Sequence, residues 1–187
     1  MRMFMDPVER SQIHATLAEL KPKRLLEWGS GGSTVEFLER HSSIERLVSI
    51  EHHPAWFERV RANIRDERLS YHLMEASEDE PGIGPLGLNV GVRSLWRHRA
   101  ESRREMFADY VDFPKSLGLT YDCVFIDGRA RRFCIEAGWE LLEPGGVMII
   151  HDAHRKAYHA MLRRFGRPQF LNPWRKGQVC LMRKEAA

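Results

Sequence analysis

The fold is decided by a stretch near the start of the chain, which reads Leu25-Leu26-Glu27-Trp28-Gly29-Ser30-Gly31-Gly32-Ser33-Thr34. Its apolar start predicts a buried strand, its glycines predict a sharp turn, and the residues after them predict the start of a helix. A second apolar run, residues 47–50, predicts another strand that ends in Glu51. Glycine lacks a Cβ atom, so the backbone of the turn can pass close to a ligand. These features indicate a nucleoside-binding βαβ unit, in which Glu51 accepts hydrogen bonds from both ribose hydroxyls.

The spacing of the glycines separates two classes of nucleoside ligand. A dinucleotide-binding turn follows G-x-G-x-x-G, and Thr34 stands where its third glycine is required. Glu27 precedes the glycines and would face the negative charge of a pyrophosphate. The same acid suits S-adenosylmethionine (SAM), which combines an α-amino group, a sulfonium and a ribose diol. SAM is the expected cofactor, with a turn that only allows tight packing as the purely structural alternative.

At this point the sequence resembles the class I SAM-dependent methyltransferases, and the resemblance covers residues 22–183. Residues 121–128, YDCVFIDG, are similar to the family's fourth strand with its terminal acid, and residues 141–152, LLEPGGVMIIHD, are similar to its L-x-P-G-G turn and fifth strand. One departure is Ser33, which stands where the pattern E/D-x-G-x-G-x-G has its last glycine. The resemblance implies an α/β fold: a Rossmann-like three-layer sandwich with a mostly parallel seven-stranded sheet, order 3-2-1-4-5-7-6, and a C-terminal antiparallel hairpin.

Length and composition are those of one soluble domain. The chain has 187 residues, of which 43% are hydrophobic and 29% charged. We expect a single domain over residues 1–187, with an N-terminal helical region at 1–21 and an insertion at 78–115 that is a candidate lid. No apolar stretch reaches the roughly 18 residues that span a bilayer. The N-terminus lacks the apolar core of a signal peptide, and no cysteines form a C-x-x-C pair, so the predicted location is the cytoplasm.

Basic residues are concentrated in two places. The formal net charge is only +3, but residues 93–104 hold five arginines and a second run of arginines follows Asp127. Neither region contains a recognised DNA or RNA module, so no nucleic-acid or membrane partner is expected. Residues 93–104 are interpreted as a solvated helix face. A homodimer is compatible with the sequence and not required by it.

Local signals predict the order of the elements. Asp6 and Pro7 predict the start of a helix that runs to residue 20. Further strands are expected at 24–28, 46–51 and 69–74, with helices from about 32 to 40 and from 54 onward. The second of these carries Trp56, Phe57 and Val60 at a helical spacing that indicates core packing, and we extend it to Ile64. A loop at 78–92, a helical segment at 95–110, a helix at 154–165 and strands at 168–171 and 178–183 complete the chain.

Ligands of open α/β sheets bind beyond the carboxyl ends of the strands. There we expect the methionyl end of SAM to contact Glu27 and the turn, and the ribose to contact Glu51. His52 and the residues after the third strand are expected beside the adenine. The predicted cofactor-binding residues are Glu27, Gly29, Ser30, Gly31, Gly32, Ser33, Glu51, His52, Glu75 and Ala76.

The predicted catalytic residues are Asp127, His151 and Asp152, at the ends of the fourth and fifth strands. In one interpretation, based on the metal-dependent O-methyltransferases, Asp127 and Asp152 bind Mg²⁺, although His151 is a poor ligand for it. In the other, based on similarity to the glucuronoxylan 4-O-methyltransferase group, His151 or an aspartate is a general base without a metal. Arg129 and His154 are candidate substrate-binding residues. Arg129 suits a carboxylate or phosphate, or else forms a structural ion pair with Asp127 or Asp152.

The predicted function is SAM-dependent methyl transfer to an oxygen of a small-molecule or saccharide acceptor, with anionic acceptors included because of Arg129. Nitrogen acceptors are less favoured, because Ile126-Asp127-Gly128-Arg129 stands where an N-P-P-Y-like tetrad would follow the fourth strand. One alternative is a SAM- or nucleoside-binding protein without catalytic activity. An NAD-dependent oxidoreductase is the other, and the glycine spacing disfavours it.

Overall fold

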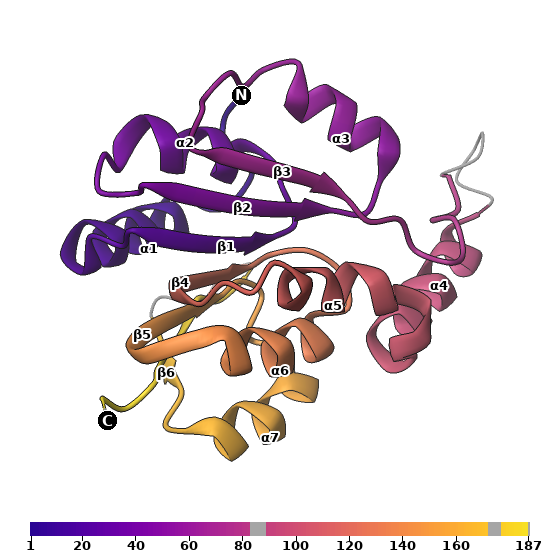
Figure 1. The fold of residues 1–187 in the computed structure, drawn as a ribbon. Coiled ribbons are helices and arrows are strands. Elements are labelled where there is room, and N and C mark those ends of the chain that lie inside the picture. The colour runs from indigo at the N-terminus through magenta and orange to yellow at the C-terminus, as the bar shows by residue number, and fades with distance from the viewer. Residues whose placement is uncertain (83–88, 172–176, 187) are drawn as a thin grey trace.

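A seven-stranded sheet runs through the molecule in the order β3-β2-β1-β4-β5-β7-β6 (Figure 1). The computed structural model describes residues 1–82, 89–171 and 177–186. Residues 83–88 of the expected loop and residues 172–176 between the last two strands lie outside these ranges. The strands are β1 (Arg24–Trp28), β2 (Arg46–Glu51), β3 (Leu69–Leu73), β4 (Tyr121–Ile126), β5 (Leu142–Ile150), β6 (Gln169–Phe170) and β7 (Cys180–Arg183).

Helices cover both faces of the sheet (Figure 1). They are α1 (Pro7–Leu20), α2 (Gly32–Arg40), α3 (Pro54–Arg61), α4 (Val90–Ser102), the 3₁₀ helix η2 (Arg104–Phe107), α5 (Ala108–Ser116), α6 (Arg131–Leu141) and α7 (Lys156–Phe165). None of the helices in the described part of the chain is long and apolar enough to cross a membrane.

The strand pairing confirms the expected topology. The pairs β1–β2, β2–β3, β1–β4 and β4–β5 are parallel, whereas β7 is antiparallel to both β5 and β6. In the register, Trp28 lies opposite both Ile50 and Ile126, and Ile126 lies opposite Ile150. The carboxyl ends of β1, β2, β4 and β5 therefore meet along one edge of the sheet, where ligands of such folds bind.

Burial on both faces of the sheet divides the apolar side chains into two cores. Leu25 packs into a core that includes α1 and α2, whereas its neighbour Leu26 packs into a core that includes α4, η2, α5, α6 and α7. This alternation is expected of a parallel strand that is covered on both sides. The three cysteines, Cys123, Cys134 and Cys180, are buried and unpaired.

Two expectations about helices are corrected. α3 ends at Arg61, before Ile64, and its Trp56 is 37% exposed rather than packed in a core. The helical segment expected at 95–110 begins earlier, at Val90, and is divided into α4, η2 and α5. By contrast, α1 begins as predicted, since the Asp6 carboxylate accepts a hydrogen bond from the Val8 backbone N–H at 2.9 Å.

Candidate active site

The glycine turn after β1 is built over a buried carboxylate. Glu27 is fully buried and accepts hydrogen bonds from the hydroxyls of Ser33, Thr34 and Ser49 at 2.5–2.6 Å. Burial disfavours the charged form more than these bonds favour it, and raises the pKa of Glu27 to about 7. Because Ser33 and Thr34 open α2, the bonds hold the turn against β1. A direct contact between Glu27 and a ligand stays a prediction.

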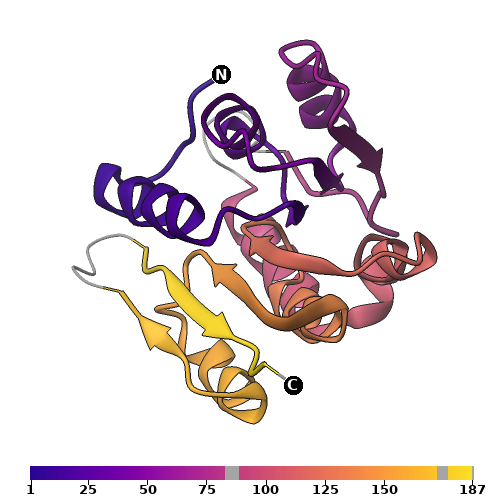
Figure 2. The same cartoon turned by 60° about the vertical axis from the view of Figure 1, so that its left-hand side comes forward.

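Two glycines of the turn are required by close backbone contacts. Gly29 has a φ of 92°, and a Cβ atom there would lie 2.4 Å from the backbone nitrogen of Gly128. The ends of β1 and β4 therefore touch backbone to backbone. At Gly32, a Cβ atom would lie 2.1 Å from the backbone of Arg2, because the N-terminal segment passes beside the start of α2 (Figure 2). The glycines thus allow both the strand ends and the N-terminus to converge on the turn.

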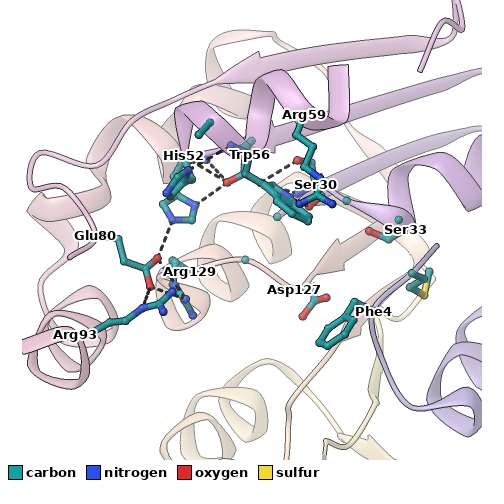
Figure 3. A pocket seen from close by; sticks show the side chains of 18 residues that line it. Phe4, Ser30, Ser33, His52, Trp56, Arg59, Glu80, Arg93, Asp127 and Arg129 are labelled. Atoms are coloured by element: carbon teal, nitrogen blue, oxygen red, sulfur yellow. Dashed lines mark hydrogen bonds and ion pairs between the residues drawn. The ribbon is translucent and has the colours of Figure 1, made fainter. Parts of the chain in front are cut away.

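A pocket of about 650 Å³ opens at this edge of the sheet (Figure 3). Its volume is within the range of roughly 300–1,000 Å³ that is usual for small-molecule sites. It is lined by Met3, Phe4, Gly29, Ser30, Gly31, Gly32, Ser33, Glu51, His52, His53, Ala55, Trp56, Arg59, Glu80, Arg93, Asp127, Gly128 and Arg129. The structure thus brings most of the predicted turn residues together with Glu51, His52, Asp127 and Arg129.

Glu51 is held at the end of β2 by four donors. Its Oε2 accepts hydrogen bonds from the backbone N–H and the hydroxyl of Ser30, at 3.1 and 2.9 Å. Its Oε1 accepts bonds from the backbone N–H groups of His52 and His53, both at 2.9 Å. Burial would raise the pKa of Glu51, but the His52 side chain and these donors outweigh it and lower the pKa. Glu51 is thus an ionised acceptor that faces the pocket.

Trp56 covers the turn from the side of α3. Its indole N–H donates to the backbone carbonyl of Ser30 at 2.8 Å, and the Arg59 guanidinium lies 5.3 Å from the ring centroid. The ring also faces Gly31, where a Cβ atom would lie 3.7 Å from it. This contact explains why Trp56 is exposed: it forms a wall of the pocket instead of filling the core.

Glu75 and Ala76 line a second, adjoining pocket of about 270 Å³. The two pockets share His52, His53, Ala55 and Glu80. The Trp96 ring also lines the second pocket and stacks near His52, with 6.4 Å between the ring centroids. The residues predicted to contact adenine therefore lie beside the main pocket and continue it past His52.

Asp127 and His151 belong to a network of charged side chains beside the pocket. His151 Nδ1 lies 2.8 Å from Asp127 Oδ1, and its Nε2 lies 3.1 Å from Glu9 Oε2 on α1. Burial would lower the pKa of His151, but the charge of Asp127 outweighs it and raises the pKa to about 9. His151 is therefore an imidazolium at neutral pH. Because an imidazolium already carries its proton, His151 does not fit the role of a general base. Asp127, and not His151, lines the pocket.

Arg131 joins the two aspartates that were predicted as metal ligands. Its guanidinium donates to Asp127 Oδ1 at 3.0 Å and to Asp152 Oδ2 at 2.7 Å, and it is 5% exposed. In the described residues, no group of three or more histidine, cysteine, aspartate or glutamate side chains could hold a metal ion. The donor set does not fit Mg²⁺, because a guanidinium already bonds both carboxylates that a hard cation would need.

Arg129 pairs with neither predicted partner. Its guanidinium lies 3.2 Å from Glu80, in the segment after β3, whereas Arg131 makes the ion pairs with Asp127 and Asp152. The predicted substrate residue His154 lies in the turn after β5 and is not among the residues that line the main pocket. Of the two candidate substrate-binding residues, only Arg129 reaches the pocket.

Comparison with known families decides the class of protein. A family model described as a methyltransferase domain matches residues 26–153, which include the glycine turn, Glu51 and Asp127. The chain belongs to this methyltransferase family. The match confirms the resemblance to the class I SAM-dependent methyltransferases. A comparison with curated proteins finds no match.

Solved structures share the fold of this methyltransferase at low sequence identity. A methyltransferase-like protein from Silicibacter pomeroyi is 21% identical, with a TM-score of 0.61 over 100% of this chain and 90% of that one. An O-methyltransferase from Bacillus cereus, in complex with SAH, is 16% identical, with a TM-score of 0.63 over 96% and 82%. The N-methyltransferase NodS from Bradyrhizobium japonicum is 14% identical, with a TM-score of 0.54 over 96% and 98%. These likenesses establish the fold.

Sequence reasoning missed several residues of the methyltransferase's site. Arg131 lies four residues after Asp127, but residues 127–130 are not helical and α6 begins at Arg131, so the spacing rule for helical ion pairs could not have identified the pair. Trp56 was assigned to the core. Glu9 and Glu80 come from segments far from their partners in the sequence, and no local pattern marks either of them.

Proposed function

We propose that this methyltransferase binds SAM in the main pocket and transfers its methyl group to an oxygen of a small-molecule or saccharide acceptor. One observation carries the proposal: a single pocket holds the glycine turn, the ionised Glu51 at the end of β2 and the carboxylate of Asp127 at the end of β4. Glu51, which can accept hydrogen bonds from a ribose, and Asp127, which can accept a proton, thus line the same pocket.

Each part of SAM has a matching part of the pocket. The Glu51 carboxylate accepts the ribose hydroxyls, and the ribose takes the place of the Ser30 hydroxyl on Oε2. Ser30 keeps a partner, because its Oγ also lies 2.6 Å from the Tyr71 hydroxyl. The methionyl end lies along the turn that Glu27 supports, and the adenine extends past His52 toward Glu75 and Ala76.

Methyl transfer from a sulfonium is an in-line displacement. The acceptor oxygen forms a bond to the methyl carbon, the bond between that carbon and sulfur breaks, and S-adenosylhomocysteine (SAH) leaves with the electron pair. The hydroxyl proton must pass to a base. Three carboxylates line the pocket; Glu51 is assigned to the ribose and Glu80 is paired with arginines, so Asp127 is the candidate base. His151 and Arg131 hold Asp127 from behind at 2.8 and 3.0 Å, so they fix its orientation. Asp152 positions Arg131 in turn.

An oxygen acceptor is favoured by the residues after β4. Ile126-Asp127-Gly128-Arg129 provides a carboxylate for a hydroxyl proton, and it lacks the N-P-P-Y-like tetrad of amino-group acceptors. Structures with the same fold include O-methyltransferases from Bacillus cereus and Streptomyces achromogenes. A saccharide or another small molecule fits a pocket of about 650 Å³.

The test is SAH release from SAM in the presence of a panel of hydroxyl compounds. Asp127→Asn keeps the size of the side chain and removes the base, so we expect turnover to fall about 100-fold or more while SAH affinity stays the same. Asp112→Asn, at a half-buried aspartate on α5 that does not line the pocket, is the control and should turn over normally. Full turnover by Asp127→Asn would contradict the assigned base. SAH binding without turnover of any hydroxyl compound would favour a non-catalytic SAM-binding protein.

A further inference from the structure

Glu80 lies between Arg93 and Arg129 at the end of the pocket away from Asp127 (Figure 3), and Arg97 is a third arginine beside it. Glu80 has a side chain that is 7% exposed, and its Oε1 lies 2.8 Å from Arg93, 3.2 Å from Arg129 and 3.4 Å from Arg97. We call Arg93, Arg97 and Arg129 the arginine cluster. Arg93 and Arg97 were expected on a solvated helix face, but in the structure both lie on α4 and form ion pairs with Glu80.

The cluster carries more positive charge than Glu80 neutralises. Three guanidinium groups and one carboxylate leave two positive charges. Burial, together with the charges of Arg129 and Arg93, lowers the pKa of Arg97, as expected where cations crowd one another. His52 Nε2 lies 3.9 Å from Glu80, but the charge of a protonated His52 ring is balanced by Glu51, which lies 3.0 Å from its Nδ1. An anion placed among these groups would relieve the repulsion.

The cluster also has free donor capacity. Arg129 Nε is buried and has no hydrogen-bond partner among the described residues. Arg93 and Arg129 both line the main pocket, in which a ligand would lie. A guanidinium binds carboxylate and phosphate oxygens through two parallel hydrogen bonds, which makes Arg129 and Arg93 suitable for such a group.

SAM does not account for the excess charge. It carries a sulfonium and an ammonium against one carboxylate, so it is a net cation, and two uncompensated arginine charges would repel it. The partner that the cluster fits is therefore the second substrate. Phe4 and Trp56 provide aromatic walls elsewhere in the same pocket, and they suit the uncharged body of such a molecule.

We propose that the arginine cluster binds a carboxylate or phosphate group of the methyl acceptor, with Glu80 as the residue that positions the three guanidinium groups. The inference rests on the proposed function and names its substrate class: hydroxyl compounds that carry an acidic group, such as sugar acids or sugar phosphates. It places the acidic group in the main pocket beside Arg93 and Arg129, and the hydroxyl near Asp127, whereas the adenine extends into the second pocket toward Glu75 and Ala76.

The experiment measures binding of small anions to the SAH-loaded protein by calorimetry or NMR titration. The probes are D-glucuronate, with D-glucose as its uncharged counterpart, and inorganic phosphate. We expect an anion to bind and glucose not to. Arg129→Gln and Arg93→Gln should each weaken anion binding about tenfold or more, since each removes a charged hydrogen bond. Binding of glucuronate alone indicates a carboxylate acceptor, and binding of phosphate alone indicates a phosphorylated one.

The matched control is Arg99→Gln. Arg99 lies on α4, as Arg93 does, and pairs with Glu78 at 3.0 Å. It does not line the main pocket, so its variant should bind anions like the wild type. The proposal is overturned if Arg129→Gln binds the anions as well as the wild type does. It is also overturned if Arg129→Gln weakens SAH but not 5′-methylthioadenosine, because the cluster would then hold the cofactor's own carboxylate. Failure of the wild type to bind SAH would instead refute the proposed function.

Discussion

Glu27→Gln tests whether the acid before the glycine turn is a buried charge that lowers stability at neutral pH. The substitution keeps the shape of the side chain and removes its charge. A carboxyl whose pKa rises from 4.5 to about 7 holds its proton more tightly in the folded state. It therefore contributes stability that is fully present below pH 4.5 and is lost as the pH rises through about 7. This pKa shift changes the free energy of unfolding by about 3 kcal/mol in total. About 2 kcal/mol of that change occurs between roughly pH 5 and pH 8.

Urea unfolding of both proteins across this pH range measures the effect. The free energy of unfolding of Glu27→Gln, minus that of the wild type, should rise by about 2 kcal/mol from pH 5 to pH 8. A difference that stays flat over this range would refute the reasoning, because a residue without a shifted pKa leaves no such slope.

Glu36→Gln is the matched control, a second buried glutamate with the opposite shift. Burial would raise the pKa of Glu36, but the hydrogen bond from Arg10 at 2.6 Å and further donors outweigh it and lower the pKa to about 2. Its contribution to stability is present above pH 4.5 and is lost as the pH falls through about 2. Glu36→Gln should therefore be less stable than the wild type at neutral pH, with no gain toward pH 8.

Gly29→Ala should cost about 1–3 kcal/mol more stability in urea unfolding than Gly145→Ala. Both glycines have positive φ, 92° and 83°, but only Gly29 has backbone atoms where a Cβ would lie, so equal losses would contradict the close-contact argument. His151 should titrate near pH 9 by NMR, and a pKa below about 7 would remove the ion pair with Asp127 from the account. Since that pKa is raised, His151 contributes stability below pH 6.5 that is lost as the pH rises through about 9. SAH should bind equally with and without Mg²⁺ because Arg131 already bonds both aspartates. A gain of about tenfold with Mg²⁺ would show that the metal displaces it.

Local signals were sufficient for most of the fold. The predicted bounds of β1, α2 and β2 match the structure. Neighbouring residues marked these bounds, namely the apolar run before Gly29 and the acid Glu51. The start of α1 was marked in the same way by its cap, Asp6. The end of α3 was less predictable, because the helical spacing continues to Ile64 while the helix stops at Arg61. Spacing also cannot separate a residue that fills the core from one that covers a pocket, and Trp56 is of the second kind.

Ion-pair partners could not be predicted in the same way. The chain has 29 lysines and arginines against 26 aspartates and glutamates, so very many pairings are compatible with the sequence. The pair of His151 and Glu9 joins residues 142 positions apart, and that of Arg129 and Glu80 joins residues 49 apart. Only the folded arrangement of α1, α4 and the strand ends selects these partners. The arginine that joins Asp127 to Asp152 was consequently assigned to no role.

Calorimetric titration with SAH, on the wild type and on Glu51→Ala, tests the central claim most directly. The wild type should bind SAH, and Glu51→Ala should bind it roughly 100-fold more weakly, since hydrogen bonds to a charged acceptor contribute about 1.5–3 kcal/mol. Glu58→Ala removes an exposed glutamate of α3 and should bind like the wild type. Circular dichroism must show that Glu51→Ala is folded, and Glu51→Gln, which loses the charge alone, should weaken binding in the same direction. Undiminished affinity in both Glu51 variants, or no binding by the wild type, would contradict the assignment of this pocket to SAM.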